Sequence, residues 1–152
     1  MLLDGVNHVA TLTSDSDRLH RFYESVFDAT VSRDGEAEEG VGMRLSFVDI
    51  GPHTQLNVFE VPGNDEARRQ TPMFGRGRID HLGLHAASLD AFHTIRDRLM
   101  AAGASDGFVT DFGPILSVFF RDPDGLEGEV CVDNPAAVPG VFHPPGTPAP
   151  GY

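Results

Sequence analysis

The sequence has 152 residues, 40% of them apolar, and its 23 acidic and 11 basic residues give a net charge of −12. This length and apolar content suit one domain, or two small modules that share a core. The strong negative charge argues against a nucleic-acid partner and against an anionic membrane surface.

Two further features of the sequence bear on the compartment. No apolar run reaches 18 residues and no signal-peptide pattern is present, so we expect a cytoplasmic protein without a membrane partner. The single cysteine, Cys131, excludes an internal disulfide and fits a reducing environment.

The first half of the chain predicts a strand, a helix and three more strands. The Ser-Asp-Ser-Asp run at 14–17 is a helix N-cap signal. Leu19, Phe22 and Val26 then recur at helical spacing, which is typical of an amphipathic helix of about three turns. The acidic, Gly-containing stretch 34–40 predicts a loop or hairpin turn. Alternation of apolar residues places the strands at 5–13, 29–33, 43–50 and 55–61.

The second half repeats this plan after a polar linker at 62–78. Apolar residues at helical spacing predict a helix over 88–102, ended by Gly103. Before the last strand, Asp-Pro-Asp-Gly at 122–125 predicts a turn, because Pro presets one φ and Gly takes a positive φ. The strands are expected at 79–86, 107–111, 115–121 and 127–132.

The two halves match when the chain is shifted by 73 residues, the separation of His8 from His81. The helices then overlap, and Gln55 falls one residue short of Glu129. Each half therefore predicts a βαβββ module with one polar residue on its first strand and another on its last. The four matched side chains would converge if the modules pack about a pseudo-two-fold axis.

The four matched residues have the chemistry of a metal site. Glu129 lies between apolar neighbours on the last strand, where a carboxylate is costly unless it is paired or binds a metal. Two imidazoles, an amide oxygen and a carboxylate suit one divalent ion per site, namely Zn, Fe, Mn, Co or Ni. A histidine alone is more often a hydrogen-bonded core residue, so this expectation depends on the match between the halves.

Three motifs carry a resemblance to a known superfamily. They are Asn-His-Val-Ala at 7–10, Asp-His-Leu-Gly at 80–83, and Phe-Arg-Asp-Pro-Asp-Gly at 120–125, the last followed by Glu129. Together with the Phe22-Tyr23 helix they resemble the vicinal oxygen chelate superfamily. This group includes glyoxalase I, bleomycin and fosfomycin resistance proteins, methylmalonyl-CoA epimerase and extradiol dioxygenases.

The resemblance implies an α+β fold in which two βαβββ modules, 5–61 and 79–132, form a curved mixed sheet around a metal-site cavity. It implies a single domain over 1–133 that forms a homodimer, and it leaves the tail 134–152 outside. The implied metal ligands are His8, Gln55, His81 and Glu129. Two residues depart from the pattern, because Leu126 replaces a usual Asn and Gly128 replaces a bulky aliphatic. We therefore expect the last strand to be locally loose.

The resemblance also suggests residues that contact a small-molecule substrate. Ser117 and Phe119 have the parity of inward residues and match ligand-contacting positions in fosfomycin-resistance relatives. His85 shares the strand face of His81, where it is either a base near the site or a residue at the solvated strand end. Glu38 resembles a catalytic carboxylate of the epimerases, although a solvated acidic loop is the simpler interpretation.

The function that these residues imply is metal-dependent catalysis of the glyoxalase or epimerase type. A proton would move at a carbon next to a metal-bound carbonyl of a small oxygenated substrate, with Glu129 as the shuttle and Glu38 as a second candidate. One alternative is an Fe(II) extradiol-type dioxygenase, because two His and one carboxylate form its facial triad. Another is a drug-binding resistance protein without chemistry.

The Pro-rich tail 134–152 cannot form a helix or a central strand. Unlike most disordered tails it contains large apolar residues. We therefore expect it to pack on the domain or across a dimer interface, against the alternative of a free tail. The expected anchors are Val138, Val141, Phe142 and Tyr152.

Overall fold

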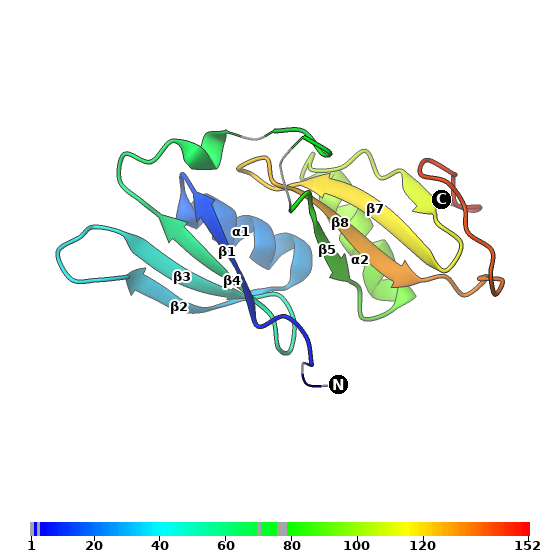
Figure 1. The fold of residues 1–152 in the computed structure, drawn as a ribbon, viewed down its shortest axis with the longest axis horizontal. Coiled ribbons are helices and arrows are strands. Elements are labelled where there is room, and N and C mark those ends of the chain that lie inside the picture. The colour runs from blue at the N-terminus through cyan, green and yellow to red at the C-terminus, as the bar shows by residue number, and fades with distance from the viewer. Residues whose placement is uncertain (1, 3, 70, 76–78) are drawn as a thin grey trace. The chain divides into compact units, whose positions relative to one another are not determined.

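The computed structural model describes all residues except 1, 3, 70 and 76–78, and the chain divides into two compact units. The first unit comprises Met1–Gln70 with Pro123–Gly125, and the second comprises Thr71–Asp122 with Leu126–Tyr152. Each unit is a four-stranded mixed sheet with an α-helix on one face (Figure 1). The predicted α+β class and the βαβββ plan of each half are confirmed. Residues 70 and 76–78 of the predicted linker lie outside the described residues.

The first unit pairs its first strand with its last. The sheet order is β1-β4-β3-β2, and β1 runs parallel to β4 while the other neighbours are antiparallel. The register places His8 opposite Gln55. The elements in chain order are β1 (His8–Thr13), α1 (Ser16–Phe27), β2 (Thr30–Glu36), β3 (Arg44–Asp49), β4 (Gln55–Glu60) and the short 3₁₀ helix η1 (Glu66–Arg68).

The helix α1 begins and ends where its sequence provides caps. The Asp15 side chain accepts a hydrogen bond from the Arg18 N–H, which satisfies one of the free donors of the first turn. Asp28 takes a left-handed φ of 53° and ends the helix. Between these caps Leu19 and Val26 are each 1% exposed, so the predicted apolar stripe faces the core.

The second unit has the same order of strands. The sheet runs β5-β8-β7-β6, again with the first and last strands of the unit parallel. Phe92 and Leu99 bury the inner face of its helix, and Gly103 ends that helix with a φ of +67° as predicted. The elements are β5 (Leu82–His85), α2 (Leu89–Ala101), β6 (Val109–Asp111), β7 (Ile115–Arg121) and β8 (Glu127–Asp133). Among the described residues, neither α-helix is long and apolar enough to cross a bilayer.

The expectation of a loose last strand is wrong, because Phe120 fills the space beside Gly128. The two residues face each other in the β7–β8 register, and both are buried. A Cβ added at Gly128 would lie 2.6 Å from the Phe120 ring and 3.1 Å from the Leu82 carbonyl oxygen. The missing aliphatic side chain is therefore replaced by an aromatic ring from the neighbouring strand.

The tail packs on the second unit, which confirms that part of the prediction. The Asp111 N–H donates to the Thr147 carbonyl at 2.8 Å, and the Ala149 N–H donates to the Val109 carbonyl at 3.0 Å. The tail thus lies along the edge strand β6, with a bridge between Thr110 and Pro148. Thr147 and Ala149, which are not prolines, supply the carbonyl and N–H groups that form hydrogen bonds with the edge strand β6.

The expected apolar anchors are mostly wrong. Phe142 is 75% exposed and Val138 is 59% exposed. The tail is therefore held on the unit by its backbone pairing with β6, and not by burial of these side chains. Tyr152 does contact the unit: its hydroxyl lies 2.9 Å from His93 Nε2, and its ring lies against Phe92.

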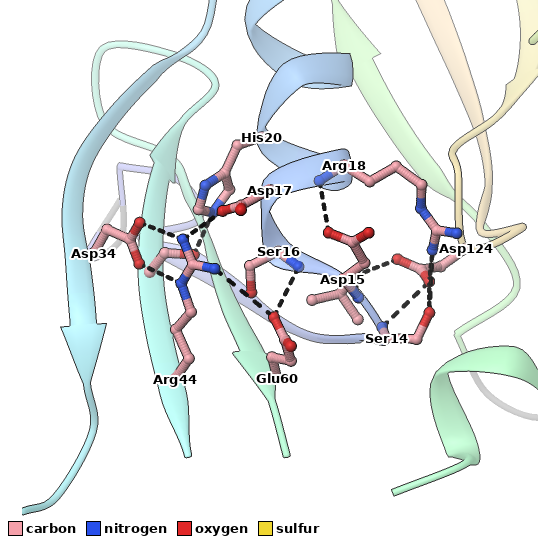
Figure 2. Close-up of polar contacts among 12 residues, drawn as sticks. Ser14, Asp15, Ser16, Asp17, Arg18, His20, Asp34, Arg44, Glu60 and Asp124 are labelled. Carbon is pink, nitrogen blue, oxygen red and sulfur yellow. Dashed lines mark hydrogen bonds and ion pairs between the residues drawn. The ribbon is translucent and has the colours of Figure 1, made fainter. Parts of the chain in front are cut away.

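A buried carboxylate binds the turn of residues 123–125 to the start of α1 (Figure 2). The Asp124 side chain is 4% exposed and accepts hydrogen bonds from the hydroxyls of Thr13 and Ser14, at 2.5 and 3.0 Å. The Arg18 guanidinium lies 2.6 Å from the same carboxylate. All four residues belong to the first unit, which therefore includes a turn that is far away in sequence.

Replacing Asp124 by Asn should lower the free energy of unfolding by about 1–3 kcal/mol, because the charge-assisted bonds weaken and buried partners lose an acceptor. Urea denaturation measures this change. Asp65→Asn is the matched control, since Asp65 forms no side-chain cap hydrogen bond with η1. Equal losses in the two variants would contradict the assignment.

Candidate metal centre

His81 and Glu129 come together in the second unit. Glu129 lies opposite Gly83 in the β5–β8 register, and a Cβ at Gly83 would be 3.5 Å from Glu129 Oε1. The absence of a side chain at Gly83 leaves room for the carboxylate to lie over β5. His81, which directly precedes β5, places its Nε2 atom 3.3 Å from Glu129 Oε1.

Asp80 fixes the orientation of the His81 ring. Its Oδ2 atom lies 2.9 Å from His81 Nδ1, so Nε2 is the nitrogen that faces Glu129. Hydrogen bonding to Asp80 and then to Glu129 raises the pKa of His81, since the imidazolium can donate to both carboxylates. The pair of carboxylates therefore makes this position attractive to a positive charge.

The first unit repeats this arrangement at His8. Asn7, the preceding residue, has its Oδ1 atom 2.8 Å from His8 Nδ1, which again leaves Nε2 as the outward nitrogen. Gln55 lies opposite His8 in register, and its Nε2 atom donates to Asp49 Oδ1 at 2.7 Å. This bond occupies the amide nitrogen and not the carbonyl oxygen, which is the atom that could bind a metal.

Glu129 has a second partner through its other oxygen. The Ser117 hydroxyl donates to Glu129 Oε2 at 2.6 Å, and the Phe119 ring centroid lies 6.1 Å from that of His81. Burial, and then the Glu129 charge, raise the pKa of Cys131 to about 11, so its thiol stays protonated at neutral pH. Both residues were selected from the sequence: Ser117 contacts the Glu129 carboxylate, and Phe119 lies opposite Glu129 in the β7–β8 register.

The remaining candidates, His85 and Glu38, make other contacts, each within its own unit. The His85 side chain is 63% exposed, and its Nε2 atom is 3.7 Å from Asp133 at the end of β8. Glu38 is exposed in the turn between β2 and β3, where its carbonyl accepts the Val41 N–H. Neither contact involves His81 or Glu129.

The His81–Glu129 pair fits a divalent ion. Two ligands that bind a tetrahedral ion at roughly 2.1 Å are separated by about 3.4 Å, close to the observed 3.3 Å between Nε2 and Oε1. Metal-binding histidines usually give their other ring nitrogen to a carboxylate or a carbonyl group, as His81 does to Asp80. Sequence reasoning assigned no role to Asp80 or Asn7, although each directly precedes a matched histidine.

A second group of ligand-type atoms lies on α1 and β2 (Figure 2). One atom from each of Asp17, His20 and Asp34 lies within 4.8 Å of the other two. The Arg44 guanidinium, however, binds Asp34 through two bonds of 2.7 and 2.6 Å and Asp17 through one of 2.7 Å. His20 Nε2 lies 2.6 Å from the Ser46 hydroxyl. These carboxylates already have a cation, so this group is a weaker metal candidate than His81 and Glu129.

Comparison with known proteins identifies related sequences. The sequence model of the Glyoxalase/Bleomycin resistance protein/Dioxygenase superfamily matches residues 5–130. A protein of an Actinomyces species named 2-epi-5-epi-valiolone epimerase is 27% identical in an alignment that covers 88% of this chain and 81% of the relative.

Solved structures share the fold at lower sequence identity. A glyoxylase/bleomycin resistance protein/dioxygenase domain from Frankia sp. EAN1pec is similar with a TM-score of 0.70 and 23% identity, over 88% of this chain and 94% of that one. A mutant of the fosfomycin resistance protein FosX from Listeria monocytogenes, in complex with Mn(II) and 1S,2S-dihydroxypropylphosphonic acid, has a TM-score of 0.64 and 16% identity. That similarity covers 85% of this chain and 92% of the other.

Arg44 should make the stability of the protein depend on acid pH. Its hydrogen bonds lower the pKa of Asp34, so the folded protein binds that proton less readily than the unfolded chain. The pair therefore stabilises the fold above the ordinary Asp pKa of about 3.9, and this contribution is lost as the pH falls through the folded pKa. Arg44→Met should lower the free energy of unfolding at pH 7, by an amount that shrinks below about pH 4.

Urea denaturation at a series of pH values and NMR titration of the Asp34 carboxyl measure both effects. The variant should also raise the pKa of Asp34. A loss of stability that is constant with pH, together with an unchanged Asp34 pKa, would contradict the role of Arg44.

Proposed function

The chain belongs to the Glyoxalase/Bleomycin resistance protein/Dioxygenase superfamily, and we propose that it is a metal-dependent enzyme of the glyoxalase or epimerase type. One observation carries the proposal. His81 Nε2 and Glu129 Oε1 lie 3.3 Å apart, while Asp80 fixes the other nitrogen of the ring. This geometry is the one expected of a metal-binding histidine beside a ligating carboxylate, and it supports the proposal.

We assign His81 and Glu129 as metal ligands, with His8 and Gln55 as the ligands that the sequence repeat predicts in addition. The hydrogen bond of Asn7 to His8 Nδ1 leaves His8 Nε2 open to a metal. The hydrogen bond from Gln55 Nε2 to Asp49 likewise leaves the Gln55 carbonyl oxygen open. The metal identity stays open among Zn, Fe, Mn, Co and Ni, since nitrogen and oxygen donors suit all five.

A bound divalent ion would supply a Lewis acid that stabilises negative charge on a substrate oxygen. Glu129 would act as the base that takes the proton from the carbon next to a carbonyl. The Ser117 hydroxyl, which donates to Oε2, keeps the carboxylate oriented for this transfer. Return of one proton to the opposite face of the same carbon completes the inversion and needs no oxidant. Glu38 is the second candidate that the sequence suggests for this proton shuttle, in place of Glu129.

The named epimerase relative supports an isomerase over the other members of the superfamily. Its name specifies 2-epi-5-epi-valiolone, which makes this compound the first substrate to test. A homodimer in the cytoplasm remains our expectation from the sequence.

The metal assignment predicts one equivalent of divalent ion per chain. His81→Ala should abolish stoichiometric binding, whereas Asp34→Asn, a matched control from the Arg44 group, should retain it. Elemental analysis after dialysis against Mn²⁺ or Zn²⁺ measures the stoichiometry. Melting with and without the ion tests the same point, since a ligand at about 100 times its Kd stabilises by about 2.7 kcal/mol. The assignment would be contradicted if His81→Ala still bound one equivalent of the ion and Asp34→Asn did not.

The reaction type is tested by isotope exchange. The metal-loaded enzyme in D2O should place deuterium at the carbon next to the carbonyl of 2-epi-5-epi-valiolone, without oxygen uptake. Glu129→Gln should reduce this rate by a factor of about 100 or more, because the carboxylate is the proposed base. Oxygen uptake on catechols would indicate the dioxygenase instead, and ligand binding with neither reaction would indicate a resistance-type binding protein.

A further inference from the structure

A hollow of about 850 Å³ lies within the first unit, at the starts of β1 and β4 and at the end of β3. Gln55, one of the two proposed metal ligands of this unit, forms part of its wall. The lining is mostly polar, and no Lys or Arg is among the described residues that form it. The side chains that matter for binding are Asp4, Asn7, Asp49, His53, Thr54 and Gln55.

The walls of this hollow are held in place by hydrogen bonds within the unit. The Gln55 N–H donates to the Asn7 carbonyl at 3.0 Å, and the Thr54 hydroxyl donates to the Val6 carbonyl at 2.8 Å. Asp49 is fixed by Gln55 and by the Ser32 hydroxyl, which both donate to its Oδ1 atom. Asp49, Thr54 and Gln55 are therefore positioned before a ligand arrives, which reduces the entropy cost of binding.

The mixture of donors and acceptors favours a ligand with hydroxyl groups over an anionic ligand. Carboxylates accept hydrogen bonds only, whereas amides and a neutral imidazole both donate and accept. Hydroxyl groups both donate and accept, so a ligand with several of them can satisfy the carboxylates and the amides together. A phosphate or carboxylate ligand would only accept, and it would meet Asp4 and Asp49 without a compensating cation.

We propose that this hollow binds the hydroxyl groups of a neutral, polyhydroxylated small molecule. The inference rests on the proposed function and deepens it by naming the substrate class as a cyclic or open-chain polyol that carries a carbonyl. Asp49 and His53 are the specificity-determining residues, one on the end of β3 and the other in the turn before β4.

The test is an NMR titration of the full-length, ¹⁵N-labelled protein in the presence of a metal chelator. Myo-inositol should shift the amides of residues 51–55 saturably, whereas cyclohexanol, with one hydroxyl, should leave them unchanged. An inositol monophosphate should bind at least about tenfold more weakly, because its charge meets two carboxylates. Asp49→Ala and His53→Ala should each weaken inositol binding by about tenfold. Asp65→Ala, in the same unit but outside the hollow, should bind as the wild type does.

Three results would overturn the proposal. They are equal binding of inositol and cyclohexanol, tighter binding of the phosphate, or of cyclohexylammonium titrated in the same way, than of inositol, and unchanged affinity in both the Asp49 and the His53 variants. The His53 variant keeps the result interpretable if Asp49→Ala perturbs Gln55. The titration needs neither metal nor turnover, so a negative result does not contradict the proposed metal chemistry. In the same way, a negative isotope-exchange result does not contradict the binding of inositol.

Discussion

The hydrogen bond from His81 Nδ1 to Asp80 is the constraint on which the account of the site depends. An imidazole that can rotate freely presents either nitrogen, but this bond commits Nε2 to the side of Glu129. The same device recurs at His8, where Asn7 takes Nδ1. In both units the residue before the histidine does the orienting, so the arrangement follows from two neighbouring positions on the chain.

A chain with a net charge of −12 must separate carboxylates that stabilise the fold from those that remain open to a ligand. Asp124 is bound by Arg18 and by two hydroxyls, and Asp17 and Asp34 share the Arg44 guanidinium. Among the described residues, by contrast, Glu129 forms side-chain hydrogen bonds with His81 and with the Ser117 hydroxyl, and neither of these partners is a permanent cation. This difference in partners is why we assign the metal to Glu129 and not to the Arg44 group.

Periodicity predicted both βαβββ modules, because each helix and strand buries one face within its own unit. The match of His8 with His81 likewise located the candidate ligands. What periodicity missed depends on contacts between side chains of different elements: Phe120 on β7 fills the space at Gly128 on β8, and Asp124 binds Thr13, 111 residues away. The tail was predicted to pack through apolar side chains, but it binds β6 through its backbone, which composition does not reveal. The full set of ligands stays a prediction.

Paramagnetic broadening by Mn²⁺ tests the central claim most directly, because it reports where the ion binds without requiring a substrate. In a ¹⁵N-labelled protein with a small excess of Mn²⁺, the account predicts that the amides around His81, Gly83 and Glu129 disappear first. Those around Asp17 and Asp34 should persist at the same concentration. Loss of the α1 and β2 signals first, with His81 and Glu129 unaffected, would contradict the assignment of this pair as the metal centre.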